Sequence, residues 1–285
     1  MKPELSIVIP VYNEENSVAP TIDSIKKVMD SVKKSYEIIA VNDGSKDSSG
    51  KVLSQISGIK FINNPYNLGY GASLKRGINE AEADWILITD ADGTYPVSMI
   101  PELLKHTNDY DMVVGARRGK NVSDQLGRKP AKWFLRTLAS LVAGKKIPDI
   151  NSGMRVFRKD LAKKYFHLYP SGFSFTTTIT VAFLSHDHTV KFIDIPYHKR
   201  VGKSSMKPRH FLSFINLIAK LFIYFKPVKM ITPLAFVLFL IGVILAVKNF
   251  YTTNTIGAAA IILILVAFQT FFLALMTDAI IKSRY

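Results

Sequence analysis

Short, mostly apolar runs alternate with helical patterns along the first 115 residues. Each run ends near Asn, Asp, Gly or Ser; the runs are Leu5–Val11, Tyr36–Val41, Ile59–Ile62, Trp85–Ile88 and Met112–Gly115. After the first run, Asn16 or Ser17 could cap a helix that reaches about Lys34, with apolar residues on one face at Val18, Ile22, Ile25 and Met29. This alternation of strand and helix predicts a doubly wound, mostly parallel α/β sheet.

Two stretches near the C-terminus carry no charge. They are Met230–Val247, of 18 residues, and Ile256–Thr277, of 22. Because a membrane-spanning helix needs about 20 apolar residues, they predict a transmembrane hairpin at about 230–248 and 256–279. A buried hairpin in a soluble core is the alternative. Basic residues flank the outer ends, so the positive-inside rule places both ends and the preceding domain on the cytoplasmic face.

Two further segments have an apolar side and few charges. Residues 130–144 contain Trp133, Lys132 and Arg136, and 206–228 contain the apolar run Phe211–Phe225. Helices of this kind can lie in the membrane interface, although a core helix also fits the first segment. The expected organisation is a catalytic domain at 1–205, a juxtamembrane amphipathic helix at 206–228, and two transmembrane helices within 229–285.

The net charge is strongly positive, with 37 Lys and Arg against 22 Asp and Glu, a formal +15. Residues 117–146 and 191–229 each hold nine basic residues and one acid. Basic patches can serve nucleic acid, anionic lipid or phosphorylated substrates. Their position beside the apolar segments argues against nucleic acid. Cysteine is absent, which excludes disulfides and thiolate metal sites.

Acidic residues follow two of the predicted strands. Asp43 comes after the second strand, and Asp90 and Asp92 follow the fourth. Open α/β sheets bind ligands at the carboxyl ends of their strands. Carboxylates there suit Mg²⁺ or Mn²⁺, which usually needs substrate phosphates to complete its shell. An Asp-rich turn that caps the next helix is the alternative interpretation of Asp90 and Asp92 alone.

Ordered segments resemble the motifs of family 2 glycosyltransferases over about residues 1–200. They are Ser6–Glu15, Val41–Asp47, Asn67–Ala72 and Asp90–Asp92. Three later segments resemble the narrower group that makes polyprenyl-phosphate sugars, which includes dolichol-phosphate mannose synthase and bacterial polyprenyl-phosphate glucosyltransferases. These segments are Val113–Arg117, Asp149–Arg155 and Arg200–Ser204.

The resemblance implies a GT-A fold, a divalent metal and an inverting transfer. It also implies a nucleotide-sugar donor of the GDP-mannose or UDP-glucose type and a dolichyl or undecaprenyl phosphate acceptor, and it leaves room for a homo-oligomer. The matching positions for the nucleotide sugar are Pro10, Tyr12, Glu14, Asp43, Asp90, Ala91 and Asp92. Asp90 and Asp92 would also hold the metal. The acceptor phosphate would meet Arg117, Arg136, Ser152, Arg200 and Lys203.

The chemistry of a phosphate acceptor needs no general base. The second pKa of a phosphate monoester is about 6, so the dianion dominates at neutral pH and can attack the anomeric carbon directly. Arg117, Arg200 and Lys203 would then offset the charge of two anionic substrates. Asp149 is expected to position groups such as Arg155 or the acceptor pocket rather than take a proton, although a base and a turn-capping residue are the alternatives.

Two other functions fit parts of the pattern. A processive polysaccharide synthase would be expected to carry Gln-x-x-Arg-Trp, whereas Gln125–Lys129 ends in Lys. An inactive nucleotide-binding membrane adaptor would not need Asp90 and Asp92. The six histidines show no metal-ligand spacing and are expected to be structural, with His186–His188 in a loop between strands.

Overall fold

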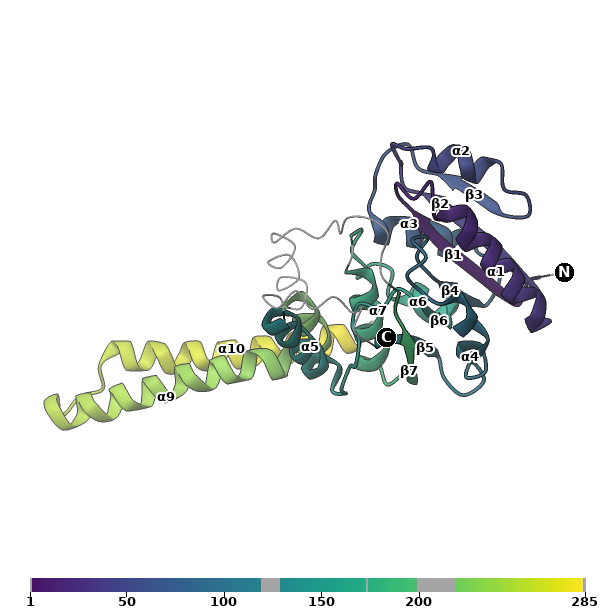
Figure 1. The fold of residues 1–285 in the computed structure, drawn as a ribbon. Coiled ribbons are helices and arrows are strands. Elements are labelled where there is room, and N and C mark those ends of the chain that lie inside the picture. The colour runs from purple at the N-terminus through teal and green to yellow at the C-terminus, as the bar shows by residue number, and fades with distance from the viewer. Residues whose placement is uncertain (1, 119–128, 173, 199–218, 284–285) are drawn as a thin grey trace. The chain divides into compact units, whose positions relative to one another are not determined.

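The computed structural model describes residues 2–118, 129–172, 174–198 and 219–283 (Figure 1). The chain divides into two compact units, Met1–Phe214 and Ile215–Tyr285. The first holds the predicted sheet and the second holds the two long apolar helices.

In the described part of the first unit, one sheet has seven strands in the order β3-β2-β1-β4-β6-β5-β7. The pairs of β1 with β2 and β4, of β2 with β3, and of β5 with β7 are parallel, whereas β6 runs antiparallel to β4 and β5. The predicted mostly parallel sheet is therefore confirmed. The strands are β1 (Leu5–Val11), β2 (Tyr36–Asn42), β3 (Lys60–Asn63), β4 (Trp85–Ile88), β5 (Met112–Arg118), β6 (Arg155–Arg158) and β7 (Val190–Pro196).

Helices connect these strands. They are α1 (Val18–Val32), α2 (Ser49–Ser54), α3 (Tyr70–Glu80), the 3₁₀ turn η1 (Val97–Met99), α4 (Ile100–Leu104), α5 (Lys129–Ala143), α6 (Lys159–Lys164) and α7 (Phe175–Ser185). The amphipathic pattern predicted to reach about Lys34 forms α1, which ends two residues earlier, where Lys33 takes a left-handed conformation. A left-handed residue ends an α-helix because it turns the backbone away from the helical path.

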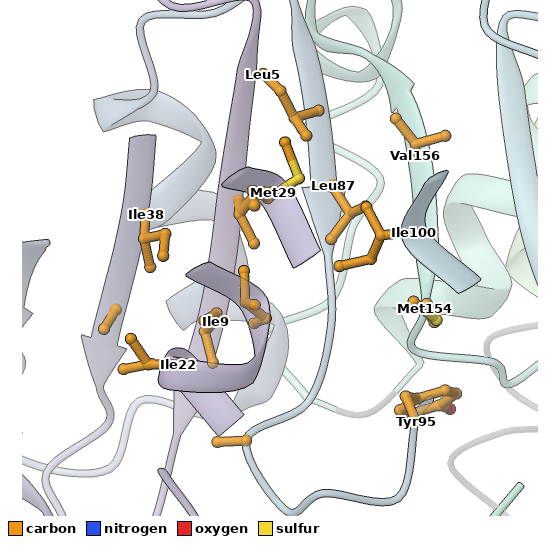
Figure 2. Packing of buried hydrophobic residues seen from close by; sticks show 14 of the residues in the cluster. Leu5, Ile9, Ile22, Met29, Ile38, Leu87, Tyr95, Ile100, Met154 and Val156 are labelled. Atoms are coloured by element: carbon orange, nitrogen blue, oxygen red, sulfur yellow. The ribbon is translucent and has the colours of Figure 1, made fainter. Parts of the chain in front are cut away.

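Alternate residues of β1 face opposite sides of the sheet. Ile7 and Ile9 join a buried cluster with Ile22 and Met29 of α1 and with Ile100 of α4 (Figure 2). Each such fully buried side chain contributes roughly 1.5–3 kcal/mol. This cluster holds α1 against one face of the sheet.

The other face of β1 carries α3. Val8 lies against Gly77, where an added Cβ would come within 2.4 Å of the valine Cγ1. Helices therefore cover both faces of the sheet, as a doubly wound fold requires. Glycine at position 77 lets α3 approach the strand closely.

One sequence prediction is wrong. The sequence predicts that the loop at His186–His188 joins two strands, but it joins helix α7 to strand β7. α7 has the sequence FTTTITVAFLS, rich in the β-branched residues that favour strands. All of its residues from Phe175 to Leu184 are buried, so tertiary packing overrides the local preference.

The second unit contains α9 (Pro227–Thr253) and α10 (Ala258–Lys282), which pack against each other. Both are long and apolar enough to cross a membrane. Only 11% and 17% of the most apolar stretch of each helix is buried, whereas a core helix of a soluble protein is mostly buried. α9 has Pro227 in its first turn and ends at Thr253, before the left-handed Asn254. Of the predicted juxtamembrane helix, residues 219–225 are helical and 206–218 lie outside the described residues.

Candidate active site

Three neighbouring parallel strands bring their carboxyl ends to one edge of the sheet. Within this arrangement Val11 of β1 lies opposite Asn42 of β2, and Val8 lies opposite Ile88 of β4. The segments that follow, 12–17, 43–48 and 89–96, therefore leave the sheet side by side. This edge is where open α/β sheets bind ligands.

The Asp90 carboxylate is held in place from two sides. The Tyr70 hydroxyl, at the first residue of α3, donates a hydrogen bond to Oδ1 at 2.9 Å. The backbone of Gly153 approaches so closely that an added Cβ would lie 2.9 Å from Oδ2. Burial, followed by the charge of Asp90, raises the pKa of Tyr70 well above its ordinary value, so this hydroxyl stays protonated and remains a donor.

Asp92 lies in the turn that follows. Its Oδ1 accepts hydrogen bonds from the Thr94 backbone N–H at 3.1 Å and from the Thr94 hydroxyl at 2.6 Å. Gly93, with φ of +70°, allows the turn. The carbonyl of Ala91 accepts a hydrogen bond from the Thr21 hydroxyl at 3.2 Å, which ties the turn to α1.

Asp43 is almost completely buried, with 3% of its surface exposed. Its two oxygens accept hydrogen bonds from the Asn64 amide at 3.0 Å and from the backbone N–H groups of Leu68 and Gly69 at 2.9 Å. Asp43 thus fixes the start of α3, from which Tyr70 reaches Asp90. The neighbouring Asn42 amide donates to Asn63 at 2.7 Å.

The other predicted donor-binding residues lie at or just beyond the end of β1. Pro10 is buried within the strand, whereas Tyr12 is 41% exposed. Glu14 is half-buried, and its Oε2 accepts a hydrogen bond from the Ser17 hydroxyl at 2.8 Å at the start of α1. Tyr12 therefore offers an exposed ring at this edge, and Glu14 offers a carboxylate.

A cavity of about 1010 Å³ opens beside these turns. Its walls come from the loop before α1, from α1 itself, from the Asp92–Ser98 segment and from His198. The backbone N–H of His198 donates to the Thr94 carbonyl at 3.0 Å. The sequence predicts a structural role for His198, and no spacing along the chain links it to Asp92, because the two are brought together only by the end of β7.

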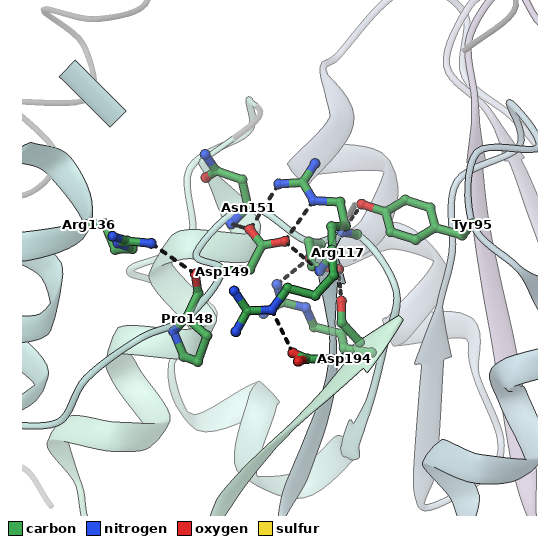
Figure 3. A network of polar contacts seen from close by, with 12 residues as sticks. Tyr95, Arg117, Arg136, Pro148, Asp149, Asn151 and Asp194 are labelled. Carbon is green, nitrogen blue, oxygen red and sulfur yellow. Dashed lines mark hydrogen bonds and ion pairs between the residues drawn. The ribbon is translucent and has the colours of Figure 1, made fainter. Parts of the chain in front are cut away.

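A second cluster lies at the ends of β5 and β7, built on an ion pair between Arg117 and Asp149 (Figure 3). The guanidinium donates from Nε to Oδ2 at 2.7 Å and from Nη2 to Oδ1 at 2.9 Å. The backbone N–H groups of Arg117 and Asn151 donate to the same carboxylate, each at 3.1 Å. The guanidinium also lies 5.2 Å from the centre of the Tyr197 ring. This two-pronged geometry fixes the orientation of Arg117.

Asp149 is ionised at neutral pH. Burial alone would raise the pKa of its carboxyl, but the hydrogen bonds and charge of Arg117 outweigh burial and hold the pKa below its ordinary value. The carboxylate pairs with Arg117 and not with Arg155. Arg155 is fully buried and donates to the Thr176 carbonyl at 2.9 Å and the Thr180 hydroxyl at 2.8 Å; its burial lowers its pKa to about 10.

The remaining residues predicted to bind the acceptor phosphate differ in burial. Ser152 is fully buried, and its hydroxyl donates to the Gly115 carbonyl at 2.5 Å. Arg136 is exposed on α5 and donates to the Pro148 carbonyl at 3.5 Å, so it lies beside the Asp149 loop (Figure 3). Arg200 and Lys203 lie outside the described residues.

The donor atoms of the Asp90 turn suit a hard divalent cation. Among the residues that the structure describes, no three His, Asp or Glu side chains form a ready-made metal site. Two carboxylates at a ligand-binding edge, without a complete protein shell, are typical of sites in which Mg²⁺ or Mn²⁺ is completed by substrate phosphates. The residues therefore fit the metal expected from the sequence.

Residues 6–166 match Glycosyl transferase family 2, over more than half of the chain. The chain belongs to this family. It is a glycosyltransferase, and the Asp90 turn and the Arg117–Asp149 ion pair both lie within the matched region.

A curated relative is 27% identical over 253 residues, covering 86% of this chain and 75% of its own length: undecaprenyl-phosphate 4-deoxy-4-formamido-L-arabinose transferase of Proteus mirabilis (strain HI4320). Among solved structures, glucosyl-3-phosphoglycerate synthase from Mycobacterium tuberculosis with Mn²⁺, UDP and phosphoglyceric acid is 19% identical, with a TM-score of 0.59 over 77% of this chain and 78% of that one. The same enzyme with Mg²⁺ and UDP gives the same values. The GT-A-like fold implied by the motifs is confirmed.

Proposed function

We propose that this glycosyltransferase is anchored in a membrane and transfers a sugar from a nucleotide sugar to a polyprenyl phosphate with inversion. The observation that carries the proposal is the similarity to the undecaprenyl-phosphate sugar transferase, which covers 86% of this chain. The two apolar helices support it, because a polyprenyl acceptor resides in a bilayer. By the flanking charges, the catalytic domain faces the cytoplasm.

On the donor side, the nucleotide would lie against Pro10, Tyr12 and Glu14 and the loop that Asp43 holds, with its diphosphate at the turn of Asp90, Ala91 and Asp92. Asp90 and Asp92 would hold Mg²⁺ or Mn²⁺, which stabilises the negative charge that develops on the leaving diphosphate. The role of Asp43 is indirect, since both of its oxygens already bind the loop before α3. The donor is of the GDP-mannose or UDP-glucose type.

On the acceptor side, the phosphate dianion is itself the nucleophile. Arg117 is the described residue best placed to bind it, because Asp149 fixes its guanidinium at the end of β5. Arg136 lies near the same loop, and Arg200 and Lys203 are assigned here from the sequence motifs alone. Ser152 supports the loop through Gly115 and would meet the phosphate only if that hydrogen bond opened. Asp149 positions Arg117 and takes no proton.

The test uses the purified full chain with a short-chain polyprenyl phosphate and a panel of labelled nucleotide sugars, with Mg²⁺ or Mn²⁺. A labelled lipid product from one donor is expected. Asp90→Ala and Asp92→Ala should each retain less than about a tenth of the rate, a loss of more than about 1.4 kcal/mol in transition-state stabilisation.

The matched control is Asp109→Ala, an exposed carboxylate before the start of β5 and away from the carboxyl ends of the strands, which should keep the wild-type rate. Transfer to every soluble phosphate but to no polyprenyl phosphate would overturn the acceptor assignment. Full activity of Asp90→Ala would overturn the metal assignment.

A further inference from the structure

Helix α10 has two contrasting faces. The buried residues of the helix are Ala260, Ala267 and Ala274, spaced seven apart along one side. α10 packs against α9 with small residues close to the contact, since an added Cβ on Gly242 would come within 2.8 Å of the Ile264 side chain. This alanine side therefore belongs to the hairpin itself.

Gln269 lies on the opposite side of α10. At 3.6 residues per turn it is rotated by about 200° from Ala267. Four large apolar residues share its side, each between 56% and 61% exposed: Ile262, Leu265, Phe272 and Met276. Gln269 is exposed as well, and it stands midway along a 22-residue stretch without charge.

The Gln269 amide needs a partner that its own hairpin does not provide. Within the described residues it forms no hydrogen bond, whereas the hydroxyl of the adjacent Thr270 donates to the Val266 carbonyl at 2.7 Å. Residues 233–247, the middle of α9, contain no side chain that can donate or accept a hydrogen bond. Lipid tails offer none either, and an amide in the bilayer core therefore favours contact with another polar helix.

The spacing on this face is that of a coiled-coil seam. Positions 262, 265, 269, 272 and 276 follow steps of three and four residues, with glutamine at the central a-type position. A single polar residue at such a position specifies which helices pair and in which register. An amide both donates and accepts, so a pair of identical amides is self-complementary.

We propose that the Ile262–Met276 face of α10 is a self-association surface occupied by a second copy of this chain. Gln269 would be hydrogen-bonded to Gln269 of the partner subunit. Two copies inserted with the same topology have parallel α10 helices. A two-fold axis along the membrane normal then places each seam residue opposite itself. The inference rests on the membrane anchoring proposed above.

The absence of cysteine allows a direct test, because a single introduced cysteine is then the only thiol in the protein. The full chain is reconstituted into phosphatidylcholine vesicles, and insertion is checked by flotation. Met276→Cys, on the seam, should form a disulfide-linked dimer on oxidation. Leu275→Cys, which is 41% exposed but turned away from the seam, is the control and should cross-link at least fivefold less.

Gln269→Leu, in the Met276→Cys background, should lower the cross-link yield at least fivefold, and Gln269→Asn should retain most of it. Energy transfer between donor- and acceptor-labelled copies should fall in the same order. Equal yields from positions 275 and 276, or an unchanged yield in Gln269→Leu, would overturn the proposal, as would association only with a different membrane protein. Failure to float would instead overturn the membrane anchoring.

Discussion

At the scale of single residues, the Asp90 carboxylate depends on Tyr70. The hydroxyl donates to Oδ1 at 2.9 Å and so fixes how the carboxylate is oriented at the end of β4. Tyr70→Phe removes this hydrogen bond and keeps the ring. A hydrogen bond to a charged group contributes about 1.5–3 kcal/mol, so we expect a roughly tenfold or greater loss of rate and a higher metal requirement. Initial rates over a series of Mn²⁺ concentrations check this. An unchanged metal requirement would contradict it.

The Asp149–Arg117 pair makes a prediction about pH. Because the Arg117 guanidinium outweighs burial and holds the pKa of Asp149 below its ordinary value, the carboxyl stays charged throughout the range from about pH 5 to pH 9. Asp149→Asn should therefore slow transfer at least tenfold, by loosening Arg117, without changing the shape of the rate profile over that range. Loss of a limb in the mutant would show that Asp149 takes a proton.

The same lowered pKa has a consequence for stability. A depressed carboxyl pKa contributes stability above the unfolded value of about 3.9 and loses it as the pH falls through the folded value. The contribution of Asp149 to the free energy of unfolding is thus present at neutral pH and disappears only in strong acid. It cannot account for any change in activity near pH 7.

At the scale of secondary-structure elements, α3 matters because it carries Tyr70 and is docked through Gly77. Gly77→Ala would force a methyl group to 2.4 Å from Val8 and 3.2 Å from Val41. Overpacking of this kind costs about 1–3 kcal/mol, so the midpoint of thermal unfolding should fall by about 2–12 °C. Gly172→Ala, whose added Cβ meets nothing within 4 Å, is the control. Calorimetry of both proteins measures the difference in midpoint. Equal midpoints would show that β1 shifts to make room for the added methyl group at no cost in stability.

At the scale of the whole molecule, the hairpin predicts a topology. Asn254 follows α9 and is exposed at the turn before α10. With both basic-flanked ends on the cytoplasmic side, Asn254→Cys should react with a membrane-impermeant thiol reagent only from the far side. Ser283→Cys, just after α10, is the matched control and should react only from the cytoplasmic side. Labelling of both positions from one side would mean that the hairpin does not span the bilayer.

Local pattern alone determined much of this protein. The strands β1, β2 and β4, the amphipathic face of α1 and the two apolar helices all follow from periodicities of two and 3.6 residues or from uninterrupted apolar length. The acidic turns after β2 and β4 could be placed at one edge because parallel strands end on the same side. These signals are carried by residues close together in the chain.

Only the tertiary structure decided which distant residues meet. The insertion of β6 between β4 and β5, the helical state of α7, the pairing of Asp149 with Arg117 and the position of His198 beside the Asp92 turn all depend on contacts between segments far apart in sequence. A β-branched run takes the helical state when burial on every side outweighs its propensity. Likewise, the geometry of the loop that carries a carboxylate determines which of several arginines it pairs with. No local sequence pattern contains that information.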